Sequence, residues 1–257
     1  MRITDRSMTR HLMSGGIAAM SLIAAVGCTP LPAPDPGPAQ SSTNAIRPAT
    51  PPAGPKILPQ VAARNFVNVV RRMEPVAEAQ CRARAPRGTN CDYLIVVDDR
   101  ADQPPNAFQT VDRTGRPVIG FTLGLIADAR NADEIAFVLG HEAAHHVAGH
   151  IPRGQQTALT GALILGALAA LGGGDAGTID VAQQMGATVG SRTFSKQFEL
   201  EADRLGTVIA YRAGYDPVRG AAFFTRIPDP GNRFLGSHPP NAARIETVRR
   251  TMAELRR

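Results

Sequence analysis

The chain of 257 residues has no tryptophan, and aromatic side chains make up only 5% of it. A packed core must therefore rely mainly on alanine, valine, leucine and isoleucine, and the apolar share of 43% is sufficient for one domain with extensions. The net charge is +6, but no dense basic patch lies on a recognisable nucleic-acid-binding module. We therefore predict no nucleic-acid partner. The arginines of the C-terminal segment, Arg244 among them, are expected to lie on a solvated helix face.

Only three cysteines are present, and the first closes an N-terminal segment typical of exported proteins. A polar stretch with three arginines precedes an apolar run of about ten residues, which is too short to span a bilayer. The sequence Ala25-Val26-Gly27-Cys28 is similar to the lipobox of bacterial lipoproteins, which implies a signal peptide over residues 1–28 and a lipid on Cys28. Thr29, where inner-membrane lipoproteins tend to have Asp, favours the outer membrane. An ordinary signal peptide cut nearby is the alternative.

The remaining cysteines, Cys81 and Cys91, are expected to form a disulfide, because export places them in an oxidising compartment. A metal site built on these two residues alone is disfavoured. Residues 29–59 are rich in proline, alanine and small polar residues and predict a flexible linker. The folded domain is expected over residues 60–257.

Hydrophobic periodicity predicts an α+β domain dominated by helix, with a small sheet beside the central helix. The central helix is expected to begin at Asn131 or Asp133, to run to His150 and to be stopped by Pro152. The apolar stretch Leu159–Leu171 is interpreted as a core helix, with membrane insertion as the alternative. Further helices are expected over 60–80, 178–213 with a break near Gly190, 217–225 and 241–255, and strands over 93–97, 107–111 and 118–123.

The chemistry of the chain is indicated first by His141-Glu142-Ala143-Ala144-His145. On a helix, positions i and i+4 share a face, so His141 and His145 can bind one metal ion. Glu142 lies one step round the helix and can reach a water on that metal without being a ligand. This is the H-E-x-x-H pattern of zinc peptidases, and it predicts one Zn2+ per chain.

A second helix offers a third ligand, because Glu199 and Asp203 are also spaced i, i+4. In the glutamate-ligand zinc peptidases, the glutamate of this pattern binds the metal and the aspartate accepts a hydrogen bond from a liganding histidine. We assign these roles to Glu199 and Asp203, with His141 as the partner of Asp203. A solvated acidic face is the alternative. Glu201 points away from this face, and His150 is interpreted as a residue near the helix end and not as a ligand.

The stretch from about residue 106 to residue 244 resembles metallopeptidase family forty-eight, in which these motifs follow in the same order. Asn106-Ala107-Phe108 is similar to the family's edge strand beside the cleft, which implies substrate-binding roles for these three residues. Residues 199–206 resemble its third-ligand helix. Ser237-His238-Pro239-Pro240, followed by Arg244-Ile245, is similar to its C-terminal motif. The resemblance implies a zincin-like fold and places His238 at the site, with a histidine packed under the prolines as the alternative.

Together these features predict a membrane-anchored zinc endopeptidase that faces the periplasm and cleaves misfolded or misassembled cell-envelope proteins. Zinc would activate a bound water, and Glu142 would accept its proton. Envelope assembly machinery is a further expected partner. Two alternatives stay open, namely a protease-like chaperone or assembly module with little proteolysis, and a different zinc hydrolase, such as an amidase, on the same ligands.

Overall fold

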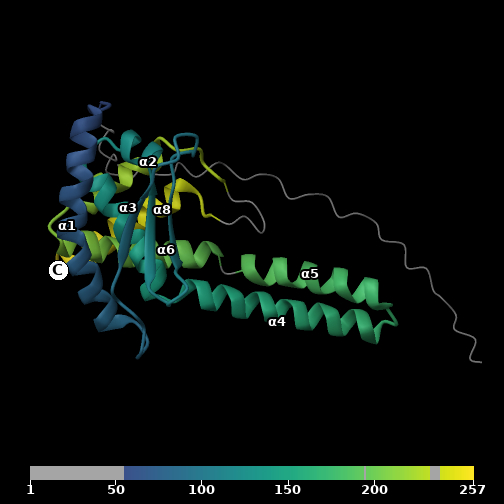
Figure 1. Ribbon diagram of the computed structural model, residues 1–257. Coiled ribbons are helices and arrows are strands. Elements are labelled where there is room, and N and C mark those ends of the chain that lie inside the picture. Colours follow the sequence, from purple (N-terminus) through teal and green to yellow (C-terminus); the bar gives the residue numbers. More distant parts are fainter. Residues whose placement is uncertain (1–54, 194, 232–237) are drawn as a thin grey trace, which may run out of the picture. The chain divides into compact units, whose positions relative to one another are not determined.

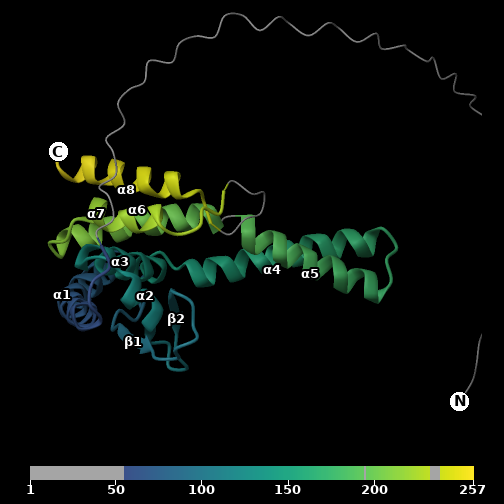
Figure 2. The same cartoon turned by 90° about the horizontal axis from the view of Figure 1, so that it is seen from above.

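The computed structural model describes residues 55–193, 195–231 and 238–257, all of which fall in one compact unit, Pro48–Arg257. Helices dominate and accompany a small three-stranded sheet (Figures 1 and 2). This confirms the predicted fold class. The elements are α1 Pro59–Arg84, β1 Leu94–Asp98, β2 Ala107–Val111, β3 Pro117–Thr122, α2 Leu123–Asp128, α3 Ala132–Val147, α4 His150–Leu171, α5 Ala176–Thr193, α6 Ser195–Arg212, α7 Pro217–Gly220, the 3-10 helix η1 Ala221–Thr225, and α8 Asn241–Leu255.

The sheet has the strand order β1-β3-β2, with β1 parallel and β2 antiparallel to β3. All three strands were predicted from the sequence to within one residue at each end. Among the described strands β2 pairs only with β3, so one of its edges is free of strand partners. Phe108 lies opposite Gly120 in the register. A side chain at Gly120 would collide with the Phe108 ring, which therefore covers the glycine.

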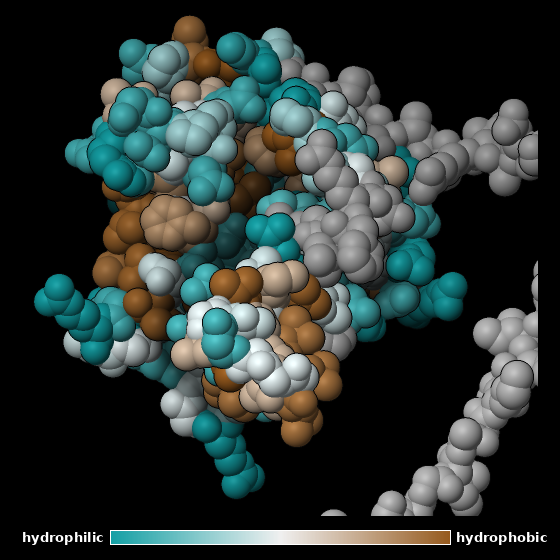
Figure 3. Space-filling model, turned by 90° about the vertical axis from the view of Figure 1, so that its right-hand side faces the viewer, coloured by the Kyte–Doolittle hydropathy of each residue, from teal (hydrophilic) through white to brown (hydrophobic). Residues whose placement is uncertain are grey.

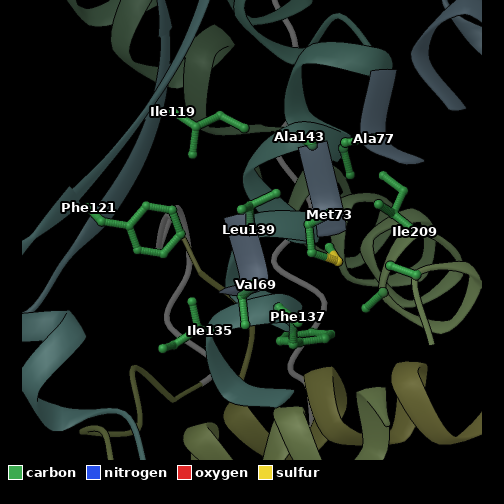
Figure 4. Close-up of a cluster of buried hydrophobic side chains, with 14 of the residues drawn as sticks. Val69, Met73, Ala77, Ile119, Phe121, Ile135, Phe137, Leu139, Ala143 and Ile209 are labelled. Atoms are coloured by element: carbon green, nitrogen blue, oxygen red, sulfur yellow. The ribbon is translucent and has the colours of Figure 1, made fainter. Parts of the chain in front are cut away.

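The core lies where α1, the sheet, α3 and α6 meet (Figure 4). Val69 and Met73 of α1 and Leu139 of α3 are fully buried there, together with Phe121 of β3 and Ile209 of α6. Full burial of one such side chain stabilises the fold by about 1.5–3 kcal/mol. Half of the chain's aromatic residues are buried in the core cluster, namely Phe66, Tyr93, Phe121, Phe137, Phe223 and Phe224.

Helices α3 and α6 approach each other closely at a pair of glycines. A Cβ atom on Gly140 would lie 2.7 Å from the carbonyl oxygen of Gly206, and one on Gly206 would lie 2.7 Å from the backbone nitrogen of His141. The two backbones can come this near only because neither residue has a side chain. This contact brings the histidine motif of α3 against the acidic motif of α6.

Two contacts fix α3 and α1 relative to the sheet. The Tyr93 hydroxyl donates a hydrogen bond of 3.1 Å to the carbonyl oxygen of Ala143, inside the histidine motif. The disulfide between Cys81 and Cys91, with the Cα atoms 5.7 Å apart, links the end of α1 to the segment before β1. The disulfide expected from the sequence is therefore present.

The prediction that the central helix runs to His150 is wrong. Helix α3 ends at Val147, and Gly149 adopts a left-handed conformation with φ of 64° before α4 begins at His150. Pro152 does not stop a helix but lies in the first turn of α4. It is tolerated there because the first four N–H groups of a helix have no partner within the helix.

Helices α4 and α5 pack side by side (Figures 1 and 2), with Gly161 against Gly186 at a distance that leaves no room for a Cβ atom. The core-helix interpretation of Leu159–Leu171 is wrong, because Leu163 is 61% and Leu168 59% exposed. Helix α4 is long and apolar enough to cross a membrane by length and composition, and 6% of its most apolar window is buried. A break was expected near Gly190, whereas the described part of α5 continues to Thr193 and α6 covers Ser195–Arg212.

Candidate metal centre

Helix α3 brings the first two predicted ligands together. Asn131 caps its first turn by accepting a hydrogen bond from the backbone N–H of Glu134. The spacing i, i+4 then places the two imidazoles on one face, with 3.0 Å between Nε2 of His141 and Nε2 of His145. Each imidazole can therefore offer one nitrogen to the same metal ion.

Helix α6 supplies the third donor, Glu199. Its Oε1 atom lies 3.4 Å from Nε2 of His145, and its Oε2 atom lies 3.6 Å from Nε2 of His141. A tetrahedral zinc with bonds of about 2.0–2.2 Å holds its ligand atoms about 3.3 Å apart. The three observed separations bracket this value, so the donor set fits one tetrahedral ion and leaves a fourth position open.

Asp203 lies directly behind His141, as the sequence predicts. Its Oδ1 atom is 2.9 Å from Nδ1 of His141, and its side chain is fully buried. The carboxylate accepts a hydrogen bond from the N–H at Nδ1, which leaves the lone pair of Nε2 free to bind a metal.

Arg244 was expected on a solvated helix face, and this expectation is wrong. The side chain is 9% exposed, and its Nε and Nη2 atoms each donate a hydrogen bond of 2.7 Å to the two carboxylate oxygens of Asp203. The guanidinium also lies 4.0 Å from the ring centroid of Phe224. Arg244 therefore fixes the carboxylate that orients His141. In the sequence, the resemblance of Arg244-Ile245 to the C-terminal motif of the family indicated that Arg244 could have a role at the site.

Glu199 and Asp203 of α6 are charged despite their burial. Burial raises the pKa of Glu199, but hydrogen bonds with His145 and His238 outweigh it and hold the pKa well below its usual range. Burial also raises the pKa of Asp203, and the charge of Arg244 outweighs it and lowers the pKa. The site therefore offers a carboxylate, the form of Glu199 that binds a metal.

The predicted ligands His141, His145 and Glu199 line a cavity of about 770 Å³, together with Glu142 and His238. Figure 3 shows a hollow on one face of the molecule with hydrophobic side chains along part of its rim. Asn106, which directly precedes β2, and Ala107 and Phe108 of β2 line part of the cavity. The structure thus places the three predicted substrate-binding residues beside the ligands.

His238 lies at the mouth of the site. Its Nδ1 atom is 3.2 Å from Oε2 of Glu199, and its side chain is 54% exposed. This position differs from that of a histidine packed under the following prolines. The residues just before it, 232–237, lie outside the described part of the chain, as does the predicted lipid site, Cys28.

Two further residues near the site were assigned no role from the sequence. His150 is buried, and its Nδ1 atom lies 2.9 Å from Nδ1 of His145. Its Nε2 atom lies 3.1 Å from Oε2 of Glu201, which faces away from the metal ligands. Burial lowers the pKa of His150 to about 4. In the sequence, the only feature that pointed to a change of helix before His150 was Gly149.

Comparison with known proteins identifies the family of this chain. The sequence profile described as Peptidase family M48 matches residues 64–252, which is more than half of the chain. The chain belongs to peptidase family M48. The family prediction is therefore confirmed, and with it the assignment to the metallopeptidases.

Three relatives share part of the M48 region. A protein of Vibrio cholerae whose name describes a beta-barrel assembly-enhancing protease is 31% identical over 46% of this chain and 25% of its own length. The metalloprotease LoiP of Escherichia coli is 28% identical over 50% of this chain and 53% of its own. The mitochondrial metalloendopeptidase OMA1 of Arabidopsis thaliana is 30% identical over 51% and 27%. The matched region thus spans about a quarter to a half of these relatives.

Proposed function

We propose that this M48 chain is a zinc-dependent endopeptidase. One observation carries the proposal: three ligand atoms of two histidines and a glutamate converge with tetrahedral spacing beside a cavity that contains Glu142 and an edge strand. His141, His145 and Glu199 would hold the zinc. Neutral imidazoles and a carboxylate are the donors that catalytic zinc sites use.

Bound zinc would supply Lewis-acid activation of a water molecule and of the scissile carbonyl. The residues of the chain then have separate tasks. Glu142 would accept the proton of the attacking water and deliver it to the leaving amine. Asp203, held by Arg244, keeps the proton of His141 on Nδ1. The charge of Glu199 remains available for the metal because its carboxyl stays ionised.

The substrate would bind in an extended conformation along β2. The free edge of this strand can hydrogen-bond to a peptide backbone and add one strand to the sheet. Phe108 is 37% exposed and lines the cavity, so it offers an apolar surface to a substrate side chain. This binding mode selects unfolded or extended segments, because a strand that is paired on both edges in a folded protein has no backbone groups left to bond to β2.

The proposal is tested with the purified full chain, its zinc content and a library of quenched fluorescent peptides. We expect about one zinc per chain, cleavage inside the peptides, and loss of cleavage with a chelator that zinc reverses. Zinc binding together with hydrolysis of small amides but of no peptide would favour an amidase. Wild-type protein that takes up no zinc would contradict the proposal.

His238→Ala is expected to change the rate of cleavage by about tenfold or more without unfolding the protein. The residue is more than half exposed and contacts Glu199, so its loss alters the site but leaves the core intact. A group that stabilises charge in the transition state contributes on this scale. Cleavage rates and the melting temperature, measured side by side, check the prediction. An unchanged rate would return His238 to a structural role.

We further propose that the protein is a lipoprotein of the cell envelope, anchored through Cys28 at the outer membrane and facing the periplasm. Its substrates would be misfolded or misassembled envelope proteins, and its partners would include envelope assembly machinery. The lipobox-like segment supports this location. So do the disulfide, which suits an oxidising compartment, and the relative whose name describes beta-barrel assembly.

Cys28→Ala is expected to abolish incorporation of radiolabelled fatty acid and to move the protein from the membrane to the soluble fraction. The cysteine thiol is the only group of the lipobox that can carry the lipid. Thr29→Ala is the matched control and should leave labelling unchanged. Full labelling of the Cys28→Ala protein would contradict the lipoprotein proposal.

A further inference from the structure

The break between α3 and α4 turns a third histidine back toward the metal ligands. Gly149 has φ of 64° and ψ of 38°, a left-handed conformation that glycine adopts without strain. The following residue, His150, is 5% exposed and lies with Nδ1 2.9 Å from Nδ1 of His145. Its ring stacks on Phe198, with centroids 4.5 Å apart and an interplanar angle of 11°. The ring is therefore held in both position and plane.

The contacts of His150 determine where its own proton lies. A carboxylate only accepts hydrogen bonds, so Oε2 of Glu201, 3.1 Å away, requires the proton on Nε2 of His150. In a neutral imidazole one ring nitrogen donates and the other accepts. Arg153, 2.9 Å from the same carboxylate oxygen, already neutralises Glu201. Nδ1 of His150 is then a bare acceptor that faces His145.

The proton position on His145 follows from this acceptor. Two ring nitrogens 2.9 Å apart need one proton between them, and here only Nδ1 of His145 can supply it. Nε2 of His145 is then left with its lone pair, 3.4 Å from Oε1 of Glu199. This is the tautomer that binds a metal through Nε2.

We propose that His150 and Glu201 are positioning residues for the ligand His145. They do for His145 what Arg244 and Asp203 do for His141, with one difference. His141 donates to a carboxylate, whereas His145 donates to a neutral imidazole that in turn donates to a carboxylate. The inference rests on the proposed function only in taking zinc as the metal, and it concerns metal affinity and tautomer, not cleavage.

The neighbouring histidine provides a matched control. His146 lies directly after His145, but its Nε2 atom is 2.7 Å from the carbonyl oxygen of Asn90 and its ring packs edge-on against Tyr93. It makes none of the contacts that link His145 to Glu201. Comparing His150→Ala with His146→Ala therefore distinguishes two causes of weaker zinc binding. One is loss of the hydrogen-bond chain, and the other is loss of any histidine near the site.

The first test is zinc affinity of the full chain, measured by competition with a chelator at neutral pH. His150→Ala should bind zinc about 10- to 100-fold more weakly, the usual cost of removing a partner of a metal-ligating histidine. His150→Gln should recover much of this loss, because an amide can accept from His145 and donate to Glu201. His146→Ala should bind as the wild type does. Wild-type affinity in His150→Ala would overturn the proposal.

The second test needs no variant and covers the case in which His150→Ala does not fold. Nitrogen NMR of the histidine rings in metal-free wild-type protein should show His145 protonated at Nδ1 and bare at Nε2. A proton on Nε2 of His145 would overturn the proposal. Wild-type protein that binds no zinc but shows the Nδ1 proton would refute the proposed function and leave the positioning role standing.

Discussion

Glu142→Gln is expected to keep the bound metal and to lose peptide cleavage by a factor of about 10²–10⁴, the contribution of a positioned general base. Glutamine has the same shape as glutamate but cannot accept and return a proton. Glu142 lines the cavity and is not among the three residues whose donor atoms converge. The metal site should therefore be unaffected. Zinc content and the kcat/KM for a fluorescent peptide, measured on the same preparation, check both halves of the prediction.

The matched control for this change is Glu254→Gln on α8. Glu254 is 57% exposed and pairs only loosely with Arg204, at 3.5 Å, so the same chemical change there should leave zinc and cleavage as they are. Cleavage retained in Glu142→Gln would reject Glu142 as the base. A Glu142→Gln protein that cleaves nothing yet supports the cell's envelope fully would instead favour the chaperone or assembly role.

Glu199→Ala is expected to weaken zinc binding by at least about 100-fold, because it removes a direct ligand where loss of a supporting hydrogen bond alone costs 10- to 100-fold. It also removes the only negative charge among the three ligands. The two histidines would remain on α3 as a bidentate pair. Titration with chelator-buffered zinc, followed by elemental analysis, measures the effect.

The fold of Glu199→Ala should persist, since Arg244 keeps both hydrogen bonds to Asp203 and the α3–α6 glycine contact is untouched. Circular dichroism and the melting temperature of the metal-free proteins establish this. Glu254→Ala serves as the exposed control. Zinc binding by Glu199→Ala at wild-type affinity would show that the ion is held by other groups, and the three-ligand site would be abandoned.

What the sequence determined by itself is the local part of the site. The spacing i, i+4 places His141 beside His145 and Glu199 beside Asp203 in any helix, whatever surrounds it. The strands were predictable in the same way, because β-branched runs between turn residues act locally. The order of the motifs was specific enough to identify the family, which the matched profile confirms.

Only the tertiary structure decided which groups support these residues. The sequence near Arg244 reads as a polar helix, and its burial depends on Asp203, which comes from another helix. The apolar residues of α4 look like core, yet Leu163 and Leu168 are exposed. In the described part of the chain, α5 packs against this stretch of α4 through glycines. His150 acquires its contact with His145 because a left-handed glycine, Gly149, ends α3 and starts a new helix at His150. Burial and hydrogen-bond partners arise between distant segments, and periodicity describes only what a segment does within itself.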